Sequence, residues 1–133
     1  MTISETLSRF KLYWGGSWRA PSTGQFFPTY NPYTQTPWAE IAQAGPEDVA
    51  AAVGAACETF ETTWRGVSGL KRAQLLFRLA DLIEANADEF ARTETRDNGK
   101  VIRETKSQIL FLARTFRFFA GYADKIWGKV MSL

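Results

Sequence analysis

A helix predicted from about Thr105 to Lys125 constrains this chain most, because it is apolar around most of its circumference. Its apolar residues are Ile109, Leu110, Phe111, Leu112, Ala113, Phe116, Phe118, Phe119, Tyr122, Ala123, Ile126 and Trp127. At about 100° per residue these side chains cover well over half of the helix, and charges such as Arg114 and Arg117 occupy a narrow strip. A surface helix needs an apolar face only slightly wider than about 100°. This helix therefore needs cover on two sides, and we expect the rest of the chain to cover only one.

The residue types present exclude several classes of site. The 133 residues contain no histidine and a single cysteine, Cys57. A disulfide framework, a Cys/His zinc site and a catalytic triad built on histidine are therefore excluded. Hydrophobic residues make up 45% and charged residues 23%, which is typical of a folded protein rather than a disordered one. The length predicts one domain or part of one.

The order of elements predicts an α+β chain, in which an N-terminal β-hairpin and short strands precede about four α-helices. We assign residues 1–11 to an N-terminal tail, 12–45 to strands and turns, and 46–133 to a helical segment. Leu12–Trp14 and Ser17–Arg19 flank two glycines that can adopt the positive φ angles of a tight hairpin turn. Further short strands are expected at Phe26-Phe27 and from Trp38 to Ala44. Strands this short do not form a stable sheet alone, so they belong to something larger.

Capping signals and apolar periodicity predict the helix boundaries. Pro46 suits the first position of the first helix, and Gly66 and Gly99 end the first and third helices. The predicted N-terminal caps are Ser68 for the second helix, Asn86 with Glu89 for the third, and Thr105 with Gln108 for the fourth. The predicted apolar face of the first helix consists of Val49, Val53, Ala56, Cys57, Phe60 and Trp64.

The C-terminal part of the chain is basic. Residues 100–133 contain seven Lys or Arg and two acidic residues, while the whole chain has a net charge of +2. A basic segment can bind nucleic acid or a membrane surface, but these bases are spaced rather than clustered, which favours the solvated face of a helix. The N-terminus lacks a secretory signal, and no run approaches the roughly 18 apolar residues that span a bilayer. We expect a cytoplasmic protein that binds neither nucleic acid nor membrane.

The candidate chemical groups taken singly assign no reaction. Cys57 lies in the middle of a helix on its predicted apolar face, so we expect a buried structural cysteine rather than a nucleophile. Two carboxylate pairs, Asp81 with Glu84 and Asp88 with Glu89, fit exposed helix faces better than general acid–base catalysis.

Short motifs follow one another along the chain in an ordered series. They are Gly16-Ser17-Trp18, Asn31-Pro32-Tyr33-Thr34, Ala44-Gly45-Pro46-Glu47-Asp48-Val49, Glu94-Thr95-Arg96-Asp97-Asn98-Gly99-Lys100 and Ala120-Gly121-Tyr122-Ala123-Asp124-Lys125-Ile126. The series resembles the N-terminal part of the aldehyde dehydrogenase superfamily and covers nearly the whole chain, with the last two motifs the most specific. Gln35, Arg96 and Val101 depart mildly from the family pattern, where glycine, an aliphatic residue and proline are common.

The resemblance implies an α/β Rossmann-like fold in the full-length family and oxidation of an aldehyde to an acid with NAD or NADP. In that family a cysteine thiolate attacks the carbonyl, hydride passes to nicotinamide, and a Glu-activated water releases the thioester. The groups responsible lie further along the family's chain, and Cys57 matches no catalytic motif. We therefore expect no catalytic and no cofactor-binding residues here, and residues 46–133 to be the helical segment of an incomplete cofactor-binding domain.

One family site maps partly onto this sequence. Asp97 alone is most simply a turn residue, although a carboxylate there can also face a cation. Members of the family often hold a monovalent cation with two main-chain carbonyls before Asn-Pro and with the aspartate of the Asp-Asn-Gly-Lys turn. The resemblance therefore assigns a possible monovalent cation to Thr29, Tyr30 and Asp97, with a further ligand expected from the remainder of the family's chain.

We interpret the chain as an N-terminal portion of an aldehyde dehydrogenase that is inactive by itself. Its implied partners are the remainder of the dehydrogenase chain, an aldehyde substrate and further copies in a homo-oligomer. The alternative is a stand-alone, non-enzymatic interaction or scaffold domain that docks through its aromatic C-terminal helix.

Overall fold

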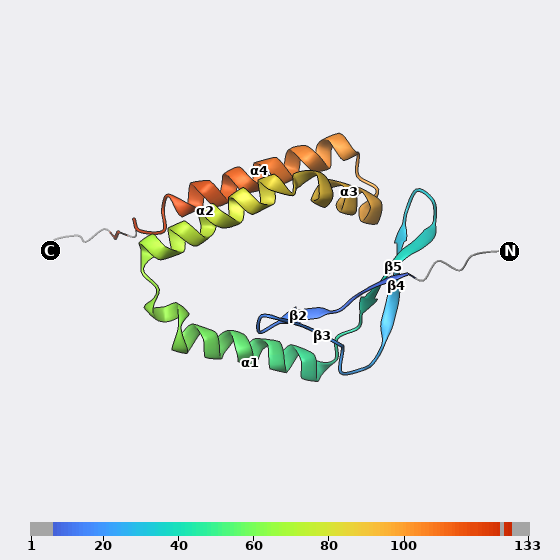
Figure 1. Ribbon diagram of the computed structural model, residues 1–133, viewed down its shortest axis with the longest axis horizontal. Coiled ribbons are helices and arrows are strands. Elements are labelled where there is room, and N and C mark those ends of the chain that lie inside the picture. The colour runs from blue at the N-terminus through green and yellow to red at the C-terminus, as the bar shows by residue number, and fades with distance from the viewer. Residues whose placement is uncertain (1–6, 126, 129–133) are drawn as a thin grey trace. The chain divides into compact units, whose positions relative to one another are not determined.

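The computed structural model describes residues 7–125 and 127–128, and the chain divides into two compact units. One unit comprises residues 1–65 with 96–99, and the other comprises residues 66–95 with 100–133. The elements in Figure 1 are β1 (Ser8–Phe10), β2 (Leu12–Trp14), β3 (Ser17–Arg19), β4 (Phe26–Asn31), β5 (Thr36–Ala42), α1 (Pro46–Thr62), the short 3-10 helix η1 (Trp64–Gly66), α2 (Gly69–Ala85), α3 (Ala87–Asn98) and α4 (Ile102–Ala120). The α+β class is confirmed. Ile126 of the predicted apolar face and residues 1–6 of the predicted tail lie outside the described residues.

The predicted hairpin is present in the first unit. Strands β2 and β3 pair in antiparallel fashion, and Gly15 and Gly16 connect them with φ angles of 59° and 75°. Positive φ at both central residues is what a two-residue turn needs to match the right-handed twist of the strands. Tyr13 and Trp18 are cross-strand partners with ring centroids 5.0 Å apart, so the hairpin also carries a stabilising aromatic pair.

A three-stranded sheet in the order β1-β5-β4 forms the rest of the first unit's β structure. Strand β1 pairs parallel with β5, and β4 pairs with β5 in antiparallel fashion. Residues 8–10 therefore form a strand within the segment expected to be a tail. Nothing local in Ser8–Phe10 indicates this, because the strand is held by β5, about thirty residues further along.

Helix α1 begins at Pro46 as predicted, but the face of the helix that other residues cover is not the predicted one. The predicted apolar face is largely exposed, with Val53 57% and Phe60 45% accessible, and Cys57 is exposed as well. Ala55 lies toward the hairpin instead, since a Cβ built on Gly15 would be 3.9 Å from the Cβ of Ala55. The expectation of a buried Cys57 is therefore wrong: helical spacing identifies an apolar face but not which face another element covers.

The second unit is built on α2 and α4, which lie side by side (Figure 1). Ala80, Ile83 and Ala113 form the buried cluster between them, and Ile109 and Phe116 pack against it. Small side chains at the contact allow the helix backbones to approach closely. Arg117 of α4 bonds both Asp81 and Glu84 of α2 at the rim of this contact.

Helix α3 begins at Ala87, directly after Asn86 as predicted, whereas the start of α4 differs from the prediction. Helix α4 begins at Ile102 with Val101 as its N-cap, not at Thr105. Thr105 lies inside the helix and is fully buried, where its hydroxyl is 2.8 Å from that of Thr95. The Asn86 amide donates to the Leu82 carbonyl, so it satisfies the end of α2. Short polar side chains serve helix ends and interior positions alike, and tertiary packing selects the role.

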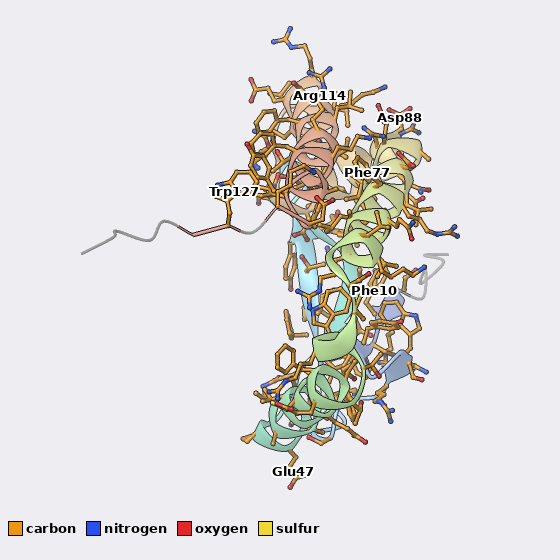
Figure 2. All side chains as sticks on the ribbon, turned by 90° about the vertical axis from the view of Figure 1, so that its left-hand side faces the viewer. Phe10, Glu47, Phe77, Asp88, Arg114 and Trp127 are labelled. Atoms are coloured by element: carbon orange, nitrogen blue, oxygen red, sulfur yellow. The ribbon has the colours of Figure 1, made fainter. Side chains whose placement is uncertain are left out.

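The expectation that the chain covers only one side of α4 is confirmed for the described residues. Ala113 and Ala120 are buried, whereas Phe111 is 69% and Phe118 is 60% exposed. Trp127, which projects beyond the end of α4 in Figure 2, is 74% exposed. Within the described residues, no helix combines the length and apolarity needed to cross a membrane.

Candidate functional site

The residues assigned to a possible cation meet in the first unit. Thr29 and Tyr30 lie on β4, and Asp97 lies in the last turn of α3, 68 residues after Thr29. The Thr29 hydroxyl donates a hydrogen bond of 2.6 Å to Oδ1 of Asp97. The structure therefore brings the carboxylate against the strand that carries the two carbonyls.

Two contacts on either side of Asp97 hold its backbone on the sheet. The Arg96 guanidinium lies 4.9 Å from the ring centroid of Trp38 on β5, a cation–π distance. Gly99 has a φ of 77°, and a Cβ at this position would be 2.8 Å from Cγ of Pro32. The turn after α3 therefore packs directly on the β4–β5 loop.

Strand β4 is irregular at the point where the two carbonyls lie. Thr29 pairs with Ala39 and Tyr30 pairs with Pro37, so Trp38 has no partner and the register shifts between the two residues. Successive carbonyls of a regular strand point in opposite directions, and a bulge redirects the backbone. The extra residue, Trp38, belongs to β5, so the irregularity interrupts the regular pairing beside Thr29 and Tyr30. A carboxylate with carbonyl oxygens is a hard donor set that suits alkali-type cations, so the residues fit the group.

The described residues contain no group of three or more His, Cys, Asp or Glu side chains that could hold a metal ion. A divalent or transition-metal centre built from side chains is therefore not supported there. The cation assigned to Thr29, Tyr30 and Asp97 differs in kind, because most of its donors are backbone oxygens.

Three of the other candidate carboxylates, Asp81, Glu84 and Asp88, are paired with bases. Lys106 lies 2.7 Å from Asp88, and its hydrogen bond and charge lower the pKa of that carboxyl. Asp81 and Glu84 both bond Arg117, which raises the pKa of the guanidinium. These ion pairs join neighbouring helices, so the expectation of exposed structural carboxylates fits their positions.

A groove in the first unit lies between the hairpin turn and α1. Its lining residues are Trp14, Gly15, Gly16, Ala52, Ala55, Ala56, Thr59, Phe60 and Trp64. None of these side chains titrates near neutral pH, so the groove has no group for acid–base chemistry.

One polar residue with a clear structural role lies outside the predicted sites. Asp48 is only 8% exposed and accepts hydrogen bonds from the backbone N–H groups of Gly45 and Ser22 and from the Ser22 hydroxyl. These bonds lower the pKa of the Asp48 carboxyl, and the bond from the Gly45 N–H has the largest effect. The signal in the sequence is an acidic residue at the third position of a helix that starts with proline.

A comparison of the sequence with models of known protein families shows to which family the chain is related. The model of the aldehyde dehydrogenase family matches residues 18–133, which is most of the chain. The chain belongs to the aldehyde dehydrogenase family. The resemblance noted in the ordered motifs is thereby confirmed.

Curated and solved members of the aldehyde dehydrogenase family match along nearly the whole chain. A (Z)-2-((N-methylformamido)methylene)-5-hydroxybutyrolactone dehydrogenase of Acinetobacter baylyi is 41% identical over 92% of this chain and 25% of its own. The mitochondrial aldehyde dehydrogenase family 2 member B4 of Arabidopsis thaliana is 39% identical over 94% of this chain and 24% of its own. The aldehyde dehydrogenase of Bacillus cereus, solved in complex with NAD+, is 35% identical with a TM-score of 0.89, over 93% of this chain and 26% of its own.

The chain thus spans about a quarter of the length of the aldehyde dehydrogenases that it matches. Its strands and helices reproduce a part of that fold closely, as the TM-score shows.

Proposed function

We propose that this chain forms the N-terminal portion of an aldehyde dehydrogenase that oxidises an aldehyde to a carboxylic acid with NAD or NADP. The match of residues 18–133 to the family supports this, together with the quarter of each relative that the chain spans. The nicotinamide cofactor, when bound, accepts the hydride from the substrate.

In this proposal the chain contributes structure rather than reacting groups. Cys57 is exposed on α1 and matches no catalytic motif, and the hairpin groove has no titratable side chain. The thiol nucleophile, the activating glutamate and the cofactor-binding residues come from the remainder of the dehydrogenase chain. The assembled enzyme acts as a cytoplasmic homo-oligomer.

The proposal also includes a monovalent cation held by the carbonyls of Thr29 and Tyr30 and by the carboxylate of Asp97. The hydrogen bond between Thr29 and Asp97 supports it, because it places the carboxylate beside the strand that carries both carbonyls. The ion would tie the end of α3 to the sheet, because its donors come from both.

A chimeric enzyme tests the proposed function. The segment of the Bacillus cereus enzyme that corresponds to this chain is replaced by this chain, and reduced cofactor formed from a short aliphatic aldehyde is followed with NAD and with NADP. We expect activity from the chimera and none from the 133 residues alone. The matched control is the same chimera with Ala113→Asp, which buries a charge between α2 and α4 and should abolish activity. A soluble, folded chimera without activity, or dehydrogenase activity from the chain alone, would contradict the proposal.

A further inference from the structure

The hydroxyl of Thr29 on the edge strand β4 is bonded to a side chain of a different element. It donates a hydrogen bond of 2.6 Å to Oδ1 of Asp97, a residue of another element. We propose that Thr29 is a positioning residue, whose hydroxyl orients the Asp97 carboxylate so that its second oxygen binds a monovalent cation of the sodium or potassium class. This inference rests on the cation included in the proposed function.

Within residues 7–125 and 127–128 the Asp97 carboxylate has no ion-pair partner, unlike Asp88 and Asp124. Asp88 is paired with Lys106 and Asp124 with Lys125, each at 2.7 Å. Among the described residues no lysine or arginine forms an ion pair with Asp97, although its neighbour Arg96 is a base. The Arg96 guanidinium is placed over the Trp38 ring instead. Among the described residues, a small cation therefore meets no competing ion pair at this carboxylate.

The hydrogen bond assigns different roles to the two carboxylate oxygens. A hydroxyl has one proton to donate, and a distance of 2.6 Å is typical of a charge-assisted O–H···O⁻ bond. Oδ1 accepts the hydrogen bond from Thr29, and Oδ2 would bind the ion. Threonine is stiff about χ1 because it is β-branched, so the donor itself is held in place by its strand.

Fixing the carboxylate before the ion arrives lowers the entropy lost on binding. The threonine thus acts at two levels: its carbonyl is a proposed ligand, and its side chain sets the direction of another ligand. Removal of a group that orients a metal ligand typically weakens metal binding about 10- to 100-fold.

Three substitutions in the full 133-residue chain separate these roles. Thr29→Val removes the hydroxyl but keeps the β-branched shape and the backbone carbonyl. Thr29→Ser restores a hydroxyl, and is the rescue variant. Thr36→Val is the matched control, because the Thr36 hydroxyl lies on β5 and is paired with that of Thr34.

Two measurements report on the ion directly. Sodium NMR linewidths are titrated with protein and reversed with potassium chloride. Unfolding temperatures are compared in sodium chloride and in choline chloride at equal ionic strength. We expect the parent chain, Thr29→Ser and Thr36→Val to show the sodium-specific broadening and stabilisation, and Thr29→Val to bind sodium about tenfold or more weakly. If the hydroxyl had a merely structural role, Thr29→Val would lower the unfolding temperature equally in both salts.

The outcomes are distinguishable. Sodium binding by Thr29→Val equal to that of the parent, with binding lost in Asp97→Asn, would overturn the positioning role and leave the cation site intact. No sodium-specific signal from the parent would overturn both. Weakening in Thr36→Val as large as in Thr29→Val would also overturn the role. The dehydrogenase proposal is tested separately by the chimera.

Discussion

At the scale of single residues, Asp48 joins two segments of the first unit, the start of α1 and the loop before β4. Its carboxylate accepts bonds from Gly45 at the start of α1 and from Ser22 in the loop before β4. Because the pKa of Asp48 is lowered in the folded chain, the carboxylate stabilises the fold fully above the ordinary aspartate value of about 3.9. This stabilisation is lost as the pH falls through the folded-state pKa.

We expect Asp48→Asn to lower the unfolding temperature near neutral pH. The unfolding temperature of the variant should also fall less than that of the parent when the solution is acidified. The difference between parent and variant should be constant from about pH 7 to about pH 5 and should shrink below about pH 4. Thermal unfolding followed by circular dichroism over this range measures it. Ser22→Ala, which removes only one donor, should give a smaller difference, and a difference that grows in acid would refute the assignment.

Gly99 is the second residue on which the site geometry depends. Its φ of 77° and the nearby Pro32 leave no room for a side chain, so Gly99→Ala should cost on the order of 1–2 kcal/mol. Gly54→Ala is the contrasting control, since Gly54 lies inside α1 with open space around it and the change should stabilise by about 0.5–1 kcal/mol. Urea unfolding of both variants measures these effects, and equal effects of the same sign would count against this account of the turn.

At the scale of elements, the best predicted features depend on neighbours a few residues apart. Ser68 caps α2 by accepting a bond from the Lys71 N–H, as its position indicated. The glycine pair closes the β2–β3 turn. Thr105 was assigned wrongly because its signal, a hydroxyl ahead of an apolar run, is the same for a cap and for a buried bond to Thr95.

The contact between α2 and α4 makes a prediction about helix packing. Ala113 is fully buried against α2, so Ala113→Leu should overpack the contact and cost about 1–3 kcal/mol. Phe111→Ala on the same helix should change the stability of the 133-residue chain by less than about 0.5 kcal/mol, because Phe111 is largely exposed. Urea unfolding compares the two, and a larger loss from Phe111→Ala would show that the exposed face is covered within the chain.

At the scale of the whole molecule, the buried core consists mainly of alanines while most large apolar side chains are exposed. In the part of the chain that the structure describes, the buried apolar residues are Ala39, Ala42, Ala73, Ala80, Ile83, Ala87, Ala91, Ala113 and Ala120. A core of small side chains beside exposed phenylalanines is what a partial domain presents when its second covering layer is elsewhere. Much of the aromatic content of 14% therefore lies on exposed surface rather than in the core.

We expect the isolated chain to self-associate through the exposed face of α4. Size-exclusion chromatography with light scattering should give a mass above the 15.0 kDa of the monomer. Replacing Phe111, Phe118 and Phe119 together by serine should shift the chain toward monomer. Tyr33→Ser is the control, since Tyr33 is 92% exposed but lies alone in the β4–β5 loop. A clean monomer at high concentration would favour the alternative of a stand-alone interaction domain.

The sequence by itself determined the local elements and the family. The glycine turn, the helix beginning at Pro46 and the apolar excess of α4 follow from backbone angles and side-chain spacing within a few residues. Only the tertiary structure decided that β1 joins β5, that Cys57 is exposed, and that the hydroxyl of Thr29 meets Asp97. Those facts depend on which distant segments pack together, and local spacing carries no information about the partner that a face or a hydroxyl will find.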